Sequence, residues 1–101
     1  MPEECLDNER EAERAGDRYY AAMTAWLTRR KRSEEERHRA FGLAHVYNRS
    51  LDLLIDCLER IKNRSDARRK LHHAAELRSH LEKDIETLGS PGGLRSQTDE
   101  I

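Results

Sequence analysis

RRKRSEEERHR, from Arg29 to Arg39, is the stretch that decides how this chain folds. It has no apolar side chain, begins with four cations and continues with three glutamates after Ser33. Cations favour the C-terminal end of a helix and anions favour the N-terminal end, because of the helix dipole. Ser33 and Glu36 also have the spacing of a capping box, in which each side chain bonds to the other's backbone amide. The stretch therefore predicts that one helix ends here and the next begins.

An unbroken helix through this stretch is the alternative. Three base–acid pairs stand four residues apart, as neighbours on one helix face do: Arg30–Glu34, Lys31–Glu35 and Arg32–Glu36. The base comes first in each pair, which is the weaker order. We therefore favour the junction. The adjacent glutamates also argue against a nucleic-acid patch or a nuclear-import signal in the RRKR run.

Residues 34–62 have the pattern of a central helix. Six apolar residues form a stripe with alternating spacings of three and four: Ala44, Tyr47, Leu51, Leu54, Leu58 and Ile61. Such spacing is typical of a coiled-coil seam. Further apolar residues widen the stripe beyond one face: Phe41, Leu43, Val46, Leu53, Ile55 and Cys57. A helix that is apolar on more than one side packs between neighbours.

A first helix is expected over about residues 3–32. The early half of its apolar stripe holds only cysteine and alanine, so the later half, with Tyr19, Trp26 and Leu27, anchors it. Tyr20 lies off that stripe and is expected to face solvent. Gly16 is taken to lie at a helix margin rather than inside a packed helix.

A third helix is expected over about residues 66–88. The turn before it falls at 62–66, where Asn63 tolerates a left-handed backbone and Ser65 can cap the helix. Gly89-Ser90-Pro91 ends the helix, and residues 90–101 are expected to be a disordered tail. The predicted fold is all-α, an antiparallel three-helix bundle or elongated helical hairpin with coiled-coil-like packing over residues 1–89.

The composition predicts a thin core and a need for partners. Hydrophobic residues make up 36% and charged residues 39% of the chain, against roughly 45–50% and 25% in typical domains. A chain of 101 residues with so few large apolar side chains gains stability by sharing its core, so we expect self-association. The net charge of −1 argues against a dedicated binder of nucleic acid or of an anionic membrane, since those are usually strongly basic.

The two cysteines, Cys5 and Cys57, are interpreted as free thiols in a reducing compartment. The N-terminal residues MPEECLDNERE are acidic where a secretory signal is basic and then apolar. No apolar run reaches the roughly 20 residues of a membrane span. These observations predict a soluble, cytoplasmic protein without a membrane partner.

The five histidines raise the question of a metal site. His72, Glu76 and His80 are spaced along one helix face, and Glu35-x-x-His38 matches half of a di-iron site. A di-iron bundle needs a second such motif, and the chain has none. We therefore expect histidines in solvent or at the rim of the core, with no metal and no cofactor.

Two patterns in the sequence could indicate catalysis. His45 on the central helix is a candidate for phosphotransfer, but the charged neighbours such a histidine needs are missing, and a packed interior position is preferred. Arg68 and His72 fit an arginine–histidine ribonuclease pattern, which is frequent by chance in a chain this rich in both residues. We expect no enzymatic activity.

The predicted function is a non-enzymatic protein–protein interaction module, acting as an adaptor, inhibitor, assembly factor or small structural subunit. Tyrosine and arginine dominate binding hot spots, and exposed apolar residues supply affinity. The candidate partner-binding residues are Tyr20, Arg29, Arg30, Phe41, Leu53 and Ile55. The alternative is a small nucleic-acid-binding regulator whose clusters at 29–32 and 64–70 contact phosphates.

Overall fold

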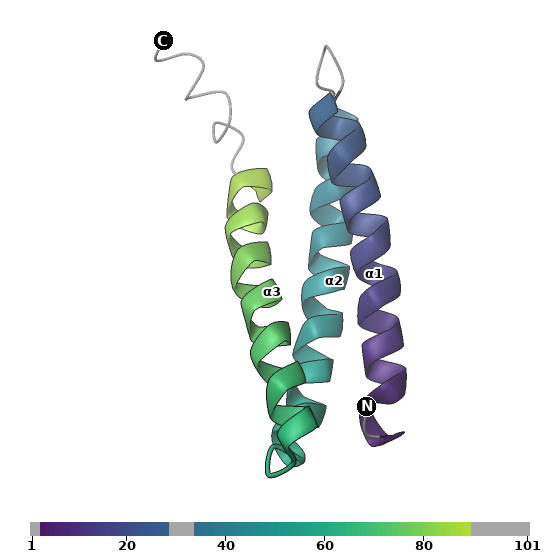
Figure 1. Ribbon diagram of the computed structural model, residues 1–101. Helices are drawn as coiled ribbons and strands as arrows, with labels where there is room; N and C mark the ends of the chain where they lie inside the picture. The colour runs from purple at the N-terminus through teal and green to yellow at the C-terminus, as the bar shows by residue number, and fades with distance from the viewer. Residues whose placement is uncertain (1–2, 29–33, 90–101) are drawn as a thin grey trace.

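Three helices make up the part of the chain that the structure describes. This computed structural model describes residues 3–28 and 34–89, which contain no strand. The helices are α1 (Glu3–Thr28), α2 (Glu34–Arg60) and α3 (Ser65–Gly89). α1 and α3 run in one direction and α2 runs in the other, between them and behind them (Figure 1). The all-α fold and the three-helix bundle are confirmed.

The junction between α1 and α2 decides against one continuous helix. The two helices pack side by side in opposite directions (Figure 1), so the chain reverses between Thr28 and Glu34. The unbroken-helix alternative is therefore wrong. Three glutamates, 34 to 36, occupy the first turn of α2, where the helix dipole favours them. The predicted cap Ser33 and the predicted extension of the first helix to residue 32 lie outside the described residues.

The turn between α2 and α3 differs from the prediction in its backbone. α2 ends at Arg60, and the amides of Ile61 and Arg64 donate to carbonyls three residues earlier, at 3.1 Å each. No described non-glycine residue has a positive φ, so the expected left-handed Asn63 is wrong. A tight turn of i→i+3 hydrogen bonds closes the connection without it. The side-chain acceptor at the start of α3 is Asp66, whose Oδ1 accepts from the amide of Ala67 at 3.0 Å.

The core forms along the two faces of α2, as expected of a central helix. α2 packs on both α1 and α3. The core residues with the least exposure are Cys5, Tyr19, Ala40, Ala44, Leu51, Leu58, Ala67, Ala74, Leu81 and Leu88. Only a few of these are large, so the core is thin. No helix in the described ranges is both long and apolar enough to cross a membrane.

Gly16 lies inside α1 and not at a helix margin. A Cβ atom placed on it would stand 3.0 Å from Cζ and 3.2 Å from the hydroxyl of Tyr47. The absence of a side chain therefore lets the hydroxyl end of the Tyr47 ring approach the backbone of α1. Gly16 sets how closely α1 and α2 approach at mid-height.

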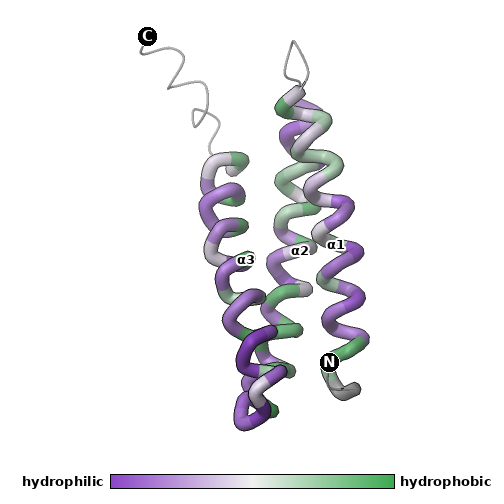
Figure 2. Tube along the Cα trace, viewed as in Figure 1, coloured by the Kyte–Doolittle hydropathy of each residue, from purple (hydrophilic) through white to green (hydrophobic). Residues whose placement is uncertain are grey.

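Cys5 and Cys57 form a disulfide, so the prediction of free thiols is wrong. Their Cα atoms are 5.8 Å apart although 52 residues separate them in sequence, and both are buried. The antiparallel packing of α1 and α2 brings them to the same level. The early half of α1 is mostly hydrophilic (Figure 2) and contributes little but alanine to the core. The disulfide therefore holds the part of α1 that hydrophobic packing holds least.

Candidate protein-binding site

α1 and α3 lie on the same side of α2, and the surface between them is hollowed at one level. Both helices pack on α2, but among the described residues no Cα atom of one lies within 8 Å of a Cα atom of the other. Two side-chain bridges cross the gap. Lys70 Nζ pairs with Glu9 Oε2 at 2.8 Å, and the Tyr19 hydroxyl donates to Asp84 Oδ2 at 2.7 Å. We call this surface the α1–α3 groove.

A hollow of about 240 Å³ lies in the groove, beside the Glu9–Lys70 bridge. The buried side chains of Tyr47, Leu51 and Leu54 line it from α2. The residues that line it from the two flanking helices are Glu9, Ala12, Glu13, Lys70, His73, Ala74 and Leu77. An apolar base with charged groups at its edge is the usual build of a recognition pocket. The hollow has room for a large side chain of a partner.

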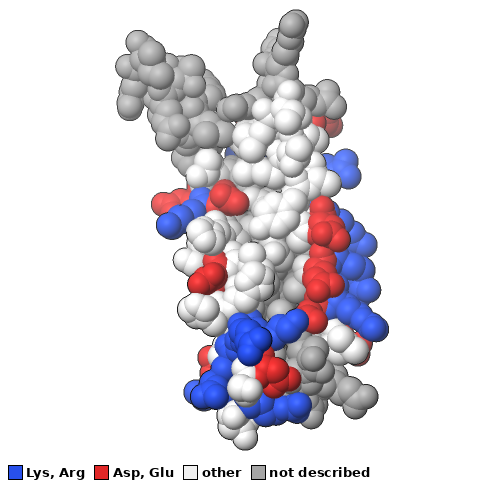
Figure 3. All heavy atoms as spheres, viewed as in Figure 1, with Lys and Arg blue, Asp and Glu red and all other residues white. Residues whose placement is uncertain are grey.

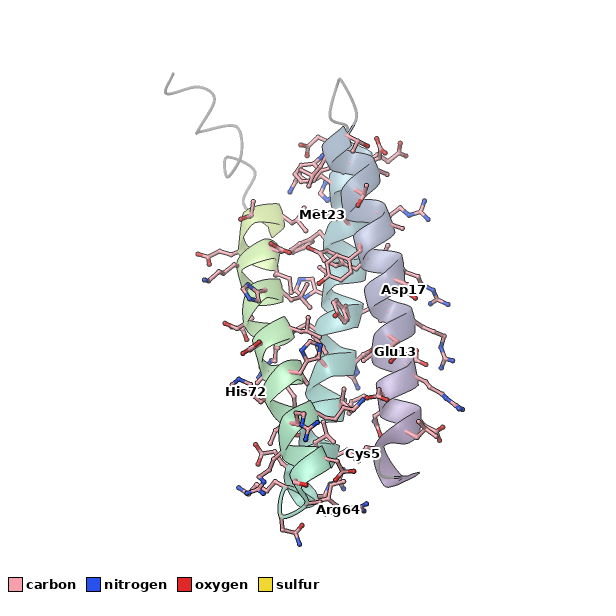
Figure 4. The ribbon with its side chains drawn as sticks, viewed as in Figure 1. Cys5, Glu13, Asp17, Met23, Arg64 and His72 are labelled. Carbon is pink, nitrogen blue, oxygen red and sulfur yellow. A yellow bond between two sulfur atoms is a disulfide. The ribbon has the colours of Figure 1, made fainter. Side chains whose placement is uncertain are left out.

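The α1 wall of the groove is acidic. Glu13 and Asp17 stand one turn apart on α1 (Figure 4), both are exposed, and neither has an ion-pair partner among the described residues. Over α1, a column of acidic side chains borders an uncharged central surface (Figure 3). Two unpaired carboxylates beside an apolar surface favour a partner with cations at the matching positions.

Above the acidic residues the wall becomes aromatic. Tyr20 is 49% exposed, which confirms that it faces outward, and its ring meets that of Tyr47 edge-on with centroids 5.9 Å apart. Tyr19, by contrast, is fully buried. Burial and then the neighbouring Tyr20 hydroxyl raise the pKa of Tyr47 to about 12. Tyr47 therefore stays protonated, and Tyr20 presents a fixed, half-exposed ring at the groove.

The opposite surface of the molecule is the outer face of α2. Val46 and Leu53 are 50% and 47% exposed, seven residues apart on that helix. Arg49 lies between them and Asp56 lies beyond Leu53; both are exposed. We call these four residues the α2 ridge. The predicted exposure of Leu53 is confirmed, and it lies away from Tyr20 and the groove.

Phe41 and Ile55 are half-buried, so their predicted exposure is wrong. The Phe41 ring would meet a Cβ atom on Gly89 at 3.0 Å and stands edge-on to His45, with ring centroids 4.6 Å apart. Ile55 packs against the core on the α3 side of α2. Both side chains already serve the α2–α3 contact. Arg29 and Arg30, the other two predicted binding residues, lie outside the described residues.

The basic cluster of the nucleic-acid alternative gathers at the turn between α2 and α3, where Arg64 lies (Figure 4). Two of its members face carboxylates: Arg64 is 3.7 Å from Asp66, and Lys70 pairs with Glu9. Arg68 and Arg69 are exposed without an ion pair in the described ranges. The cluster is therefore about half neutralised. Its predicted counterpart at 29–32 lies outside the described residues.

All five histidines are exposed, as expected of solvated side chains. The preferred interior position of His45 is wrong, because α2 turns that residue outward. His72 Nε2 lies 2.9 Å from Glu76 Oε1 on the same helix face. Within residues 3–28 and 34–89, no three metal-ligating side chains come together.

The acidic wall is the part of the site that sequence reasoning missed. Glu9, Glu13 and Asp17 recur every fourth residue, which places them on one helix face. That spacing is a usable signal, but in a chain so rich in charge it has no meaning until the neighbouring helix is known. No protein-family model, no curated protein and no solved structure matches this chain. The candidate site therefore rests on the geometry of the described residues alone.

Proposed function

We propose that this protein is a non-enzymatic interaction module that binds another protein through the α1–α3 groove. The observation that carries the proposal is the hollow between α1 and α3, two helices that both pack on α2 and whose Cα atoms stay more than 8 Å apart in the described ranges. A fourth helix laid there would complete a bundle. A helix satisfies its own backbone hydrogen bonds, whereas an extended segment would find no backbone partner between two helices.

Three features of the groove support this function. The hollow has an apolar base for an anchoring side chain. Tyr20 supplies an exposed ring of the kind that is enriched at binding hot spots. Glu13 and Asp17 supply charge that no described residue pairs with. The binding module acts as an adaptor, inhibitor, assembly factor or structural subunit, according to what occupies the groove.

A pull-down from cell lysate tests this proposal. Wild-type protein, Tyr20→Ala and the control Ala21→Ser are compared with and without nuclease. Ala21 is also exposed, but it lines a different depression, between α1 and α2. We expect a stoichiometric protein partner that survives nuclease, is lost with Tyr20→Ala and is kept by the control. Equal capture by Tyr20→Ala would place the interaction elsewhere.

Salt separates this function from the nucleic-acid alternative. Binding that neutralises phosphates weakens by several orders of magnitude between about 50 and 200 mM salt. A groove that binds mainly by apolar contact is much less sensitive. The half-neutralised state of the cluster at 64–70 favours the protein partner over nucleic acid.

The cytoplasmic location remains an expectation. One of its supports was the free state of the cysteines, and the Cys5–Cys57 disulfide removes that support. Disulfides are rare in the cytosol of mesophiles and persist in oxidising compartments. Rapid alkylation of the protein in its source cells, read as a mass shift, reports whether the two cysteines are joined there.

A further inference from the structure

We propose that the occupant of the α1–α3 groove is the α2 ridge of a second copy of this chain. The inference rests on the proposed use of the groove and names its partner. The groove and the ridge lie on opposite faces of the same molecule, since α1 and α3 cover one side of α2 and the ridge is its other side (Figure 1). Each copy therefore has both halves of the contact.

The ridge has the chemistry that the groove lacks. Its exposed apolar residues, Val46 and Leu53, are the kind of side chain that the hollow and Tyr20 would bury. Between them stands Arg49, which has no ion-pair partner among the described residues. The α1 wall offers unpaired carboxylates. The ridge therefore offers a cation and apolar side chains, and the groove offers carboxylates and an apolar hollow, so the two faces are complementary.

The order of residues also matches. Val46 lies seven residues before Leu53, and Tyr20 lies seven residues after Glu13, a rise of about 10 Å in each helix. Arg49 lies four residues before Leu53 in α2, and Asp17 lies four residues after Glu13 in α1. Leu53 and Glu13 are the two residues that the alignment places at the hollow. α2 runs antiparallel to α1. In a second copy with the same orientation as the first, Leu53, Arg49 and Val46 therefore follow one another in the same direction as Glu13, Asp17 and Tyr20 of the first copy.

Three pairings follow from this alignment. Leu53 of the second copy enters the hollow beside Glu13, and its Val46 rests on Tyr20. Arg49 of the second copy meets Asp17.

The one acidic residue of the ridge is also matched. Asp56 falls about one turn beyond Leu53, at the level of the Glu9–Lys70 bridge, where it would meet the Lys70 ammonium group together with the Glu9 carboxylate that pairs with it. In this alignment both charged residues of the ridge, Arg49 and Asp56, therefore lie near a residue of opposite charge.

The contact is heterologous, because one face of the molecule meets a different face of the next. When two such faces point in opposite directions and the copies share one orientation, the assembly does not close on itself. We therefore expect open-ended association that grows with concentration, and not a dimer.

Sedimentation velocity over a range of protein concentrations tests the pairing by charge exchange. Arg49→Glu and Asp17→Arg each place like charges at the contact, and each is expected to weaken self-association at least tenfold. The two substitutions in one chain restore opposite charges and are expected to return association to the wild-type level. Lys83→Glu is the matched control, an exposed cation on α3 that lines neither the hollow nor the ridge and has no ion-pair partner among the described residues, and it is expected to have no effect. Circular dichroism verifies that each variant is folded.

A mixing experiment distinguishes this contact from a symmetric one. Leu53→Asp disrupts binding by the ridge and leaves the groove intact. Tyr20→Asp disrupts binding by the groove and leaves the ridge intact. Each variant alone is expected to be monomeric. The mixture is expected to stop at a one-to-one dimer, since only one intact groove meets one intact ridge. A symmetric contact between two copies of the same face gives no such recovery.

The inference and the proposed function fail in different ways. A wild-type chain that stays monomeric at every concentration, or single charge variants that associate like the wild type, would overturn the second copy as occupant. If the wild type captures a protein other than itself and Tyr20→Ala does not, the groove remains a binding site for that protein. If Tyr20→Ala captures the same proteins as the wild type and the chain also fails to self-associate, both proposals are wrong.

Discussion

The Tyr19 hydroxyl donates a hydrogen bond of 2.7 Å to Asp84 Oδ2 and so links two helices that have no described Cα atoms within 8 Å of each other. Tyr19 is fully buried and Asp84 is half-buried, so the bond lies at the bottom of the gap between α1 and α3. Together with the Glu9–Lys70 bridge it fixes the width of the groove. The groove is therefore held open at a set spacing by polar contacts, and its walls are in place before any partner arrives.

Removing that hydroxyl is expected to destabilise the bundle. Tyr19→Phe keeps the buried ring and deletes only the bond to the carboxylate, which costs about 2 kcal/mol for a hydrogen bond to a charged group. Urea denaturation followed by circular dichroism measures the free energy of unfolding. Tyr20→Phe is the comparison, because it deletes a hydroxyl that neighbours Tyr47 on a half-exposed residue, and it should cost less than Tyr19→Phe, about 1 kcal/mol or below. Equal stability of Tyr19→Phe and wild type would mean that the bond contributes nothing.

High pH is expected to destabilise the fold through its buried tyrosines. Burial, and then the bond to Asp84, raises the pKa of Tyr19 above its usual value, and that of Tyr47 rises to about 12. An unfolded tyrosine titrates near pH 10. Above that pH the unfolded state releases protons first, so stability is complete below about pH 10 and falls as the pH rises toward 12.

Removing the two tyrosine hydroxyls isolates this effect. Tyr19→Phe with Tyr47→Phe should flatten the dependence of the unfolding free energy on pH between about 10 and 12. The measurement is the midpoint of urea denaturation at several alkaline pH values. A slope as steep as that of the wild type would assign the loss of stability to lysines instead.

Reduction of the disulfide is expected to destabilise the protein strongly. A bond that closes a loop of 52 residues contributes about 4 kcal/mol by restricting the unfolded chain. The double variant Cys5→Ala/Cys57→Ala should lose stability by this order, and wild type in dithiothreitol should resemble it. Guanidinium denaturation with and without reductant gives both values. Hydrogen exchange should show the largest loss of protection in the early half of α1, where packing is weakest.

Alanine at two helical glycines should act in opposite directions. At Gly16 the new methyl group meets the buried ring of Tyr47 at 3.0 Å, and overpacking outweighs the gain in helix propensity, so Gly16→Ala should cost about 1 kcal/mol net. At Gly42 nothing lies within 4 Å, and Gly42→Ala should stabilise by about 1 kcal/mol. Thermal denaturation of the two variants checks the signs. Stabilisation by both would show that Tyr47 can shift without loss.

Much of the fold followed from local patterns. The three-and-four spacing from Ala44 to Ile61 identified a central helix because its residues form one seam whatever lies against them. The cations and glutamates around Ser33 identified a chain reversal because they match the ends of helix dipoles. Tyr20 was placed outside the core by its position relative to the stripe of α1. Each of these patterns depends only on one helix or on one helix end.

The features that only the tertiary structure decided join residues on different helices. Cys5 pairs with Cys57 because antiparallel packing brings residues 52 apart to a Cα separation of 5.8 Å. Phe41 and Ile55 are covered because α3 lies on their side of α2, while Val46 and Leu53 remain exposed on the other. The acidic residues Glu13 and Asp17 became the wall of a groove only once α3 was placed across from them. Periodicity along a helix says which residues share a face, and packing between helices decides what each face meets.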